Sequence, residues 1–280
     1  MPDHGTAVDA GSTRVLSVHS ITRITTEHAG QVVIAASHGG VYAGFCAAQG
    51  RVRAVIFNDA GVGRQSAGIG SLGYLDVLGI AAAAADSRSC RIGDGDDMRE
   101  SGVVSFVNAT AAALGCAPGQ RVRECADRMR GASASRQGVP AQAESRFVVQ
   151  AGSGATPVVV VDSVSLVQPS DAGAIIVTAS HGGLLGGDPA SALKVDALAA
   201  VYCDAGFGKE RAGVTRLPAL DARGIAAATV SSDSARIGDG RSVYEDGVVS
   251  CVNAMASSIG ITVGDTVRKM ICRTLGGGRR

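Results

Sequence analysis

The fold of this chain is decided by the stretch VVIAASHGG, residues 32–40. Its first five residues are apolar without alternation, which is typical of a strand buried on both faces of a parallel sheet. The glycine pair that follows is typical of a strand-to-helix turn. The stretch IIVTASHGG, residues 175–183, repeats the pattern. An α/β fold is therefore expected, with a polar motif at the end of one strand in each copy.

The remainder of the chain also contains an internal repeat. Three further motifs recur in the same order, namely DAGVG and DAGFG at 59–63 and 204–208, RIGDG at 91–95 and 236–240, and GVVS at 102–105 and 247–250. Because strand and helix patterns alternate between them, we expect a tandem duplication of a doubly wound, mainly parallel-sheet α/β unit with pseudo-twofold symmetry. The first repeat would cover residues 1–130 and the second 158–280. A linker rich in glycine, alanine and serine would cover 131–157.

Individual elements follow from periodicity and turn residues. In the first copy we expect strands at 15–22, 32–36, 53–57 and 80–85, and helices at 41–49, 68–78, 104–114 and 120–129. In the second copy we expect strands at 158–167, 174–179, 198–202 and 225–230, and helices at 189–195, 213–222, 249–259 and 265–275. The pattern leaves a short strand at 146–150 open, and fraying is expected at 276–280.

Composition narrows the function classes. The chain has a net charge of +1 and 3% aromatic residues, which disfavours nucleic acid, membrane surfaces and stacking platforms as partners. None of the 7 cysteines is spaced CxxC, so we expect neither a disulfide framework nor a bound metal. We expect a cytoplasmic protein with a small-molecule substrate and no cofactor. Assembly into a homo-oligomer is left open.

The repeated polar motifs all follow expected parallel strands. The carboxyl ends of such strands form the ligand crevice of an open α/β sheet, so His38 and His181 are candidate general bases. The serines and glycines beside them would bind substrate through helix N-terminal amides; these are Ser37, Gly39, Gly40, Ser180, Gly182 and Gly183. The alternative is that the glycines only permit turns and that each histidine bonds a neighbouring backbone group.

The charged loop motif supports two interpretations. Arg91 and Arg236 could hold a substrate anion, or they could pair with the carboxylates three residues on, Asp94 and Asp239.

The aspartates of the other loops have a similar ambiguity. Asp59 and Asp204 would orient the histidine or the substrate, or would cap helices. On the helices expected at 104–114 and 249–259, the pairs Ser105 with Asn108 and Ser250 with Asn253 would each lie on one face, either lining the crevice or capping.

One difference between the copies predicts a nucleophile. Asn58 stands before the first DAG motif and Cys203 before the second. A thiolate beside an imidazole is an activated nucleophile. The strings IVTASHGG at 176–183 and AVYCDAG at 200–206 resemble the His-Gly and Cys segments of caspase-like cysteine peptidases over under a tenth of the chain. That resemblance implies His181 as base and Cys203 as nucleophile. The alternative is that Cys203 is a small buried hydrophobe at the end of a strand.

A second resemblance concerns the first copy. Residues 58–61, NDAG, are similar to the Asn-Asp-Asp-Gly start of a metal-dependent nucleotidase family, but Ala60 replaces the second metal-binding aspartate. We therefore expect no metal there.

These observations favour an enzyme that hydrolyses an amide-like bond in a small polar or carboxylated substrate. Two alternatives stay open. One is a non-catalytic metabolite-binding or assembly protein, and the other is an isomerase or lyase with acid and base groups from both repeats. The surroundings of His181 discriminate between these functions. Cys203 within hydrogen-bond reach would favour hydrolysis, and paired acid and base groups from both copies in one cleft would favour the isomerase or lyase. A histidine enclosed by its own backbone would favour binding or a structural role.

Overall fold

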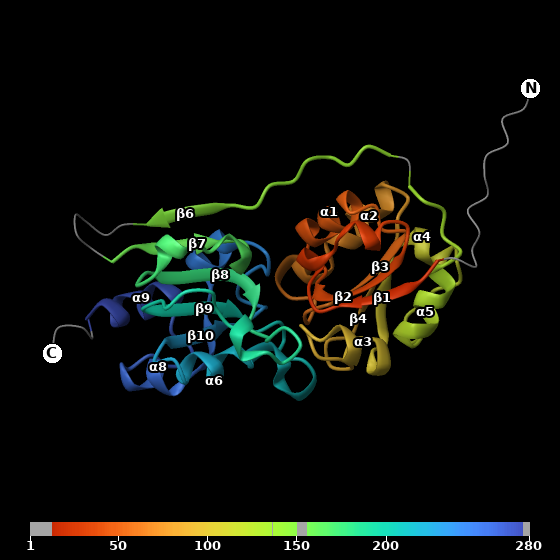
Figure 1. Ribbon diagram of the computed structural model, residues 1–280. Helices are drawn as coiled ribbons and strands as arrows, with labels where there is room; N and C mark the ends of the chain where they lie inside the picture. Colours follow the sequence, from red (N-terminus) through yellow and green to blue (C-terminus); the bar gives the residue numbers. More distant parts are fainter. Residues whose placement is uncertain (1–12, 136, 150–155, 277–280) are drawn as a thin grey trace, which may run out of the picture.

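The computed structural model describes residues 13–135, 137–149 and 156–276, and it contains two mostly parallel sheets with helices. The two sheets lie side by side, and the segment after α5 crosses from one to the other (Figure 1). We call the part with the five-stranded sheet the first half and the part with the six-stranded sheet the second half. Within the described ranges, no helix has the length and apolar character that a membrane span requires.

The strand order follows the chain in both sheets, so each strand lies beside its predecessor. The first sheet contains β1 (Val15–Val18), β2 (Val32–His38), β3 (Ala54–Asn58), β4 (Ala81–Ala85) and β5 (Val104–Val107), of which only β5 is antiparallel to its neighbour. The second sheet contains β6 (Arg146–Val149), β7 (Val158–Val161), β8 (Ile175–His181), β9 (Ala199–Cys203), β10 (Ala226–Val230) and β11 (Val249–Val252), with β6 and β11 antiparallel at the edges.

Both faces of each sheet are buried, as the continuous apolar strands require. In the first half α1 (Val41–Gln49) and α2 (Ser71–Val77) pack on one face. The other face is covered by α3 (Gly95–Ser101), α4 (Ala109–Ala112) and α5 (Val122–Met129). Alternate residues of β2 enter the two cores, because successive strand side chains point to opposite faces.

The second half covers its faces differently. One face carries α7 (Gly240–Asp246), α8 (Ala254–Ser258) and α9 (Val267–Gly276). The other carries α6 (Arg216–Asp221) and the loop 184–198, which contains only the short 3₁₀ turn η7 (Pro189–Ser191). The helix expected at 189–195 is therefore wrong beyond this turn.

The helices expected at 104–114 and 249–259 are wrong in their first parts, which are the edge strands β5 and β11. The Asn108 side chain accepts a hydrogen bond from the Ala111 amide at 2.9 Å, and Asn253 does the same for Ala256. Each asparagine thus starts a short helix as its N-cap. The serine–asparagine pairs consequently do not share a helix face.

Other boundaries differ by a few residues. The strands expected at 15–22 and 158–167 end at Val18 and Val161, where turns begin. The short strand in the linker is confirmed for 146–149, whereas Gln150 and the tail at 277–280 lie outside the described residues.

Candidate functional site

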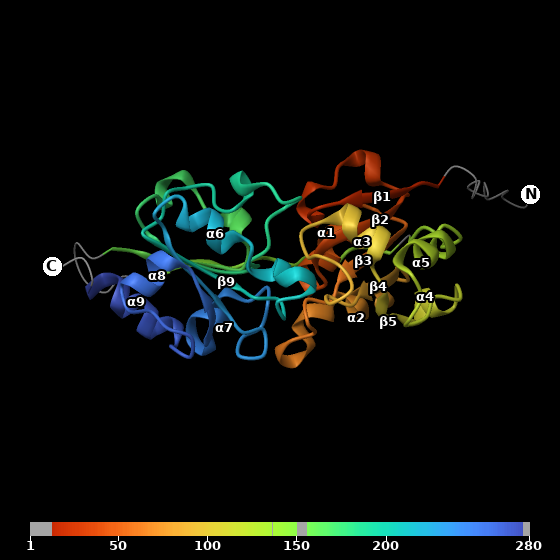
Figure 2. The same ribbon diagram turned by 90° about the horizontal axis from the view of Figure 1, so that it is seen from below.

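The carboxyl ends of the two sheets meet, and their loops make reciprocal contacts (Figure 2). A Cβ on Gly61, just beyond β3, would lie 2.9 Å from the Cα of Gly206, just beyond β9. The Arg64 amide donates to the Ser232 carbonyl and the Lys209 amide to the Ser87 carbonyl, both at 2.8 Å. A further apolar cluster contains residues from both halves, namely Ala60, Ile92, Cys203, Ala205, Ala212 and Ile237.

Backbone strain is concentrated in these meeting loops. Val62 and Phe207 adopt φ values of 64° and 62°, in the left-handed region that β-branched and bulky residues disfavour. Their neighbours Ala60 and Ala205 are also left-handed, each with a φ of 50°. Such conformations persist only where the surrounding contacts over-determine them. The junction between the halves is therefore a tightly specified part of the molecule.

The aspartates of the DAG motifs hold these loops. Asp59 accepts hydrogen bonds from the amides of Gly61 and Ser87 at 3.0 Å. Asp204 accepts from the amides of Gly206 and Ser232 at 2.9 and 3.0 Å. Both carboxylates are buried and bond their own half of the chain. These bonds form turns and join loops, and the helices that follow begin at glycines without a side-chain cap, so the two aspartates do not cap helices. No contact with a histidine is found among the described residues.

The arginines of the RIGDG motifs are also held within the protein. Arg91 pairs with Asp94 at 3.1 Å and with Glu210 of the second half at 2.9 Å. Arg236 pairs with Asp239 at 2.6 Å, and its Nη1 donates to a side-chain oxygen of the first half. These contacts fit the internal-pair interpretation, because each guanidinium already has a carboxylate partner.

The glycines of the SHGG motifs have internal partners as well. The amides of Gly39 and Gly182 donate to the carbonyls of the residues that end β3 and β9, at 3.0 and 2.7 Å. The amides of Gly40 and Gly183 donate to the histidine two residues earlier, at 3.2 Å. The amides that were expected to bind a substrate anion are therefore occupied.

The serines of the same motifs position the turns that follow β1 and β7. Ser37 Oγ accepts from the Ile21 amide and Ser180 Oγ from the Val164 amide, both at 2.9 Å. These turns end β1 and β7 earlier than the sequence predicted. They also present Ser20 and the hydroxyls near it to the space between the halves.

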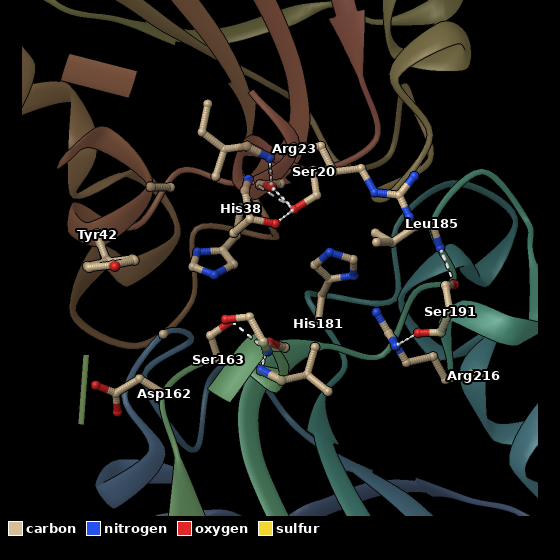
Figure 3. Close-up of a pocket in the computed structure, with 18 of the residues that line it drawn as sticks. Ser20, Arg23, His38, Tyr42, Asp162, Ser163, His181, Leu185, Ser191 and Arg216 are labelled. Carbon is tan, nitrogen blue, oxygen red and sulfur yellow. Dashed lines mark hydrogen bonds between the residues drawn. The ribbon is translucent and has the colours of Figure 1, made fainter. Parts of the chain in front are cut away.

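A cavity of about 430 Å³ lies between the halves and contains both repeated histidines (Figure 3). Residues from each half line it, among them Ser20, Ser37, His38 and Tyr42 from the first and Asp162, Ser163, Ser180, His181, Ser191, Lys194 and Arg216 from the second. Glu144, from the segment that connects the halves, lines it too. The structure thus brings His38 and His181 into one site, at the strand ends where the sequence places them.

Each histidine is close to a glycine of the opposite half. The His38 Cε1 would lie 3.2 Å from a Cβ on Gly238, and the His181 Cε1 would lie 3.4 Å from a Cβ on Gly93. A larger residue at either glycine would therefore press on the imidazole. The glycine at the third position of each RIGDG motif therefore leaves room for the histidine of the other half.

The imidazoles are held in one tautomer and kept neutral. Because each Nδ1 accepts a backbone hydrogen bond, the proton of the neutral ring is on Nε2. Burial lowers the pKa of His38 to about 4. Burial, the Arg216 charge and His38 together hold the pKa of His181 well below its usual value. At neutral pH both rings are hydrogen-bond donors through Nε2, which does not suit the expected role of general base.

Cys203 does not have the environment that a nucleophile needs. It pairs with His181 in the register of β8 and β9, but its side chain is fully buried in the apolar cluster between the halves. Burial, assisted by the Asp204 charge, raises the pKa of the thiol to about 12. A cysteine nucleophile needs partial exposure and a lowered pKa, and Cys203 has neither, so its surroundings fit a small buried hydrophobe.

Several cavity residues were missed in the sequence, and two charged ones bear on the chemistry. Arg216 begins α6, is 1% exposed and lies beside His181. Glu144 lies in the connecting segment, and burial together with the Asp162 charge raises its pKa to about 7. Neither belongs to a repeated motif, so a search for repeats passes over both. The available signal for Arg216 was a charged residue in an apolar helix pattern, and that for Glu144 was a charged residue in the expected linker.

No group of three or more histidine, cysteine or carboxylate side chains in the described part of the chain is arranged to hold a metal ion. Comparisons with protein-family models, curated proteins and solved structures each find no match for this chain.

Proposed function

We propose that this protein is an acid–base enzyme of the isomerase or lyase type, and that its substrate is a small carbonyl compound bound between the halves. We also propose that the halves are two copies of one unit related by a pseudo-twofold axis. The observation that carries the proposal is that two neutral histidines, one from each half, line a single cavity with their Nδ1 atoms bonded to backbone amides.

In this proposal the histidines stabilise negative charge. An Nε2–H donor in a water-poor site acts more strongly on a developing oxyanion than it would in water. His38 and His181 would together polarise the substrate carbonyl. Their low pKa values keep them neutral, so they remain donors without carrying charge of their own.

The proton would be moved by Glu144. A carboxyl group with a pKa of about 7 is well matched to general acid–base work near neutral pH. Its carboxylate would take a proton from the carbon next to the carbonyl, and the electron pair of that C–H bond would move onto the carbonyl oxygen. Return of the proton to a different position completes an isomerisation, whereas loss of a neighbouring leaving group completes an elimination.

Amide hydrolysis, the leading expectation from the sequence, receives less support. It needs either a protein nucleophile or a base that activates water, but Cys203 is buried with a raised pKa and both histidines have lowered pKa values. A second candidate is non-catalytic binding of the same ligand class. It is favoured by the backbone bonds to both histidines, which would equally suit a fixed recognition site.

Exchange of carbon-bound hydrogen tests the proposal. The protein is incubated in D₂O with pyruvate, 2-oxobutyrate, acetoacetate or dihydroxyacetone, and loss of the C–H signal is followed by proton NMR. Glu144→Gln should slow exchange by roughly 100-fold or more, and loss of either histidine should slow it by a similar factor. His28→Ala removes a half-buried histidine outside the cavity and should leave the exchange rate unchanged.

Two results would count against this proposal. Equal exchange with wild-type protein and Glu144→Gln would remove the proton-transfer role. Binding of the probes without any exchange would instead support the non-catalytic alternative.

A further inference from the structure

Arg216 differs from the other arginines that the sequence singled out. Arg91 and Arg236 each pair with a carboxylate, whereas no ion pair of Arg216 is found in the described ranges. Arg216 is nevertheless the more deeply buried residue, at 1% exposure. A buried charge without a counter-ion is costly unless hydrogen bonds or a ligand compensate it.

Backbone carbonyls satisfy part of this guanidinium. Its Nε donates to the Gly183 carbonyl at 2.9 Å, and its Nη1 donates to the carbonyls of Ser191 and Ala192. The Tyr202 ring lies 5.2 Å from the guanidinium carbon and adds a cation–π contact. No hydrogen bond from Nη2 to a described residue is found, and the guanidinium end lies beside His181 at the edge of the cavity (Figure 3).

The first half has no such charge. Ser71 occupies the equivalent place, because its amide bonds the Gly39 carbonyl as the Arg216 amide bonds the Gly182 carbonyl, both at 2.8 Å. Ser71 is buried, its hydroxyl has no partner, and it does not line the cavity. The two histidines therefore occupy corresponding places, but the Arg216 charge acts on His181, whereas burial alone lowers the pKa of His38.

The cavity is also polarised from one end to the other. Asp162 and Tyr42 lie on the side of His38 away from Arg216, and the Glu144 carboxyl is close enough to Asp162 for the Asp162 charge to raise its pKa (Figure 3). A carboxylate ligand would be repelled at that end and attracted at the other. Arginine also suits a carboxylate in geometry, since its planar fork can donate two parallel hydrogen bonds.

We propose that Arg216 is the carboxylate anchor of this cavity, so that the ligand is a small monocarboxylate bound in one orientation. The carboxylate would sit between Arg216 and His181, and the rest of the ligand would extend toward His38 and Glu144. This inference rests on the cavity of the proposed function and narrows its substrate to a carbonyl-containing monocarboxylate. It makes the histidines unequal, with His181 on the carboxylate and His38 on the reacting carbonyl.

The test is binding, which does not require turnover. Isothermal titration calorimetry at pH 7 and low salt compares acetate, propionate, butyrate and 2-oxobutyrate with the uncharged isosteres propionamide and butyramide. At least one carboxylate should bind more tightly than its amide. Arg216→Gln should weaken carboxylate binding by roughly 10- to 100-fold, as expected for loss of a charge-assisted hydrogen bond. Ser71→Ala is the matched control and should leave the affinity unchanged.

Arg216→Gln also removes bonds to loop carbonyls, so its thermal unfolding is measured first. If it does not fold, Arg216→Lys takes its place, because lysine keeps the charge and loses the planar fork, so carboxylate affinity should still fall. The salt dependence of wild-type binding then shows only that a cation attracts the ligand. Binding of amides as tight as that of carboxylates would overturn the inference, as would the absence of carboxylate binding or full affinity in a folded Arg216→Gln.

The two proposals fail separately. Arg216-dependent binding without hydrogen exchange would uphold the anchor and refute the enzyme. Exchange that is unaffected by Arg216→Gln would uphold the enzyme and refute the anchor.

Discussion

The segment that links β2 to β3 in the first half contains a helix, whereas the segment that links β8 to β9 in the second is the irregular loop 184–198. A helix satisfies its own backbone carbonyls, and an irregular loop needs other donors. Arg216 supplies them to Ser191 and Ala192. The half that lacks this helix is thus the half that has a buried cation at the cavity, so the two halves differ chemically.

The strand ends show a second difference. Asn58 accepts a hydrogen bond from the Ala60 amide at 2.9 Å and so helps to form its loop. Cys203 in the corresponding place packs in the apolar cluster between the halves. The residues that match between the halves mainly build the junction, and those that differ distinguish the cavity's two sides.

The largest expected effect tests whether the two junction loops are equivalent. A Cβ on Gly68 would lie 2.1 Å from the Asp59 carbonyl oxygen, and one on Gly213 would lie 1.9 Å from the Asp204 carbonyl oxygen. Gly68→Ala and Gly213→Ala should each lower the free energy of unfolding by roughly 4 kcal/mol, because backbone must move to admit the methyl group. Urea unfolding followed by circular dichroism measures this.

Gly73→Ala is the control, since nothing lies within 4 Å of a Cβ at that position in α2. It should stabilise the protein by roughly 0.5–1 kcal/mol. A large loss at only one of the two junction glycines would show that the loops are not equivalent.

The comparison of the halves also shows which features could be predicted from the sequence and which could not. Strands and motif positions could be predicted, because unbroken apolar runs and strand-end glycines reflect local requirements of the chain. The burial of Cys203 and the role of Arg216 could not, because both depend on the opposite half or on a loop distant in sequence. Repetition drew attention to polar residues whose amides and carboxylates are occupied internally, and away from Arg216, which has no repeated counterpart.

A second comparison concerns the two histidines and pH. An unfolded histidine has a pKa of about 6.5, and that of folded His38 is about 4. As pH falls from 6.5 toward 4, His38 becomes protonated in the unfolded chain but stays neutral in the folded protein. The free energy of unfolding is therefore unaffected by this histidine above pH 6.5 and decreases below it. The shift corresponds to at most about 3 kcal/mol for His38, which is half-buried.

His38→Gln and His181→Gln should each flatten the fall in unfolding free energy between pH 6.5 and 4. His181→Gln should flatten it more, because His181 is more buried and lies beside Arg216. Glu144 acts in the opposite direction, since its raised pKa removes stability as pH rises toward 7. That contribution is common to wild type and variants, so it cancels in the difference. Parallel pH profiles for wild type and both variants would contradict the assigned burial.

The smallest expected effect concerns two side-chain contacts across the junction, one made by Arg91 and one by Arg236. Arg91 Nη1 meets the Glu210 carboxylate at 2.9 Å, whereas Arg236 Nη1 meets the neutral Gln65 amide oxygen at 3.1 Å. Gln65→Glu should therefore create the missing pair, and Glu210→Gln should remove the existing one. Both sites are exposed, so the free energy of unfolding should rise in the first variant and fall in the second by only about 0.2–1 kcal/mol.

Salt separates this effect from a change in packing. Each difference should shrink between about 0.05 and 0.5 M sodium chloride, because the charges are screened at the surface. The double variant Gln65→Glu with Glu210→Gln exchanges the two arrangements and should have nearly wild-type stability. A double variant much weaker than wild type would mean that the two crossings differ in backbone geometry as well as in charge, even though residues 65 and 210 adopt φ values of 55° and 53°.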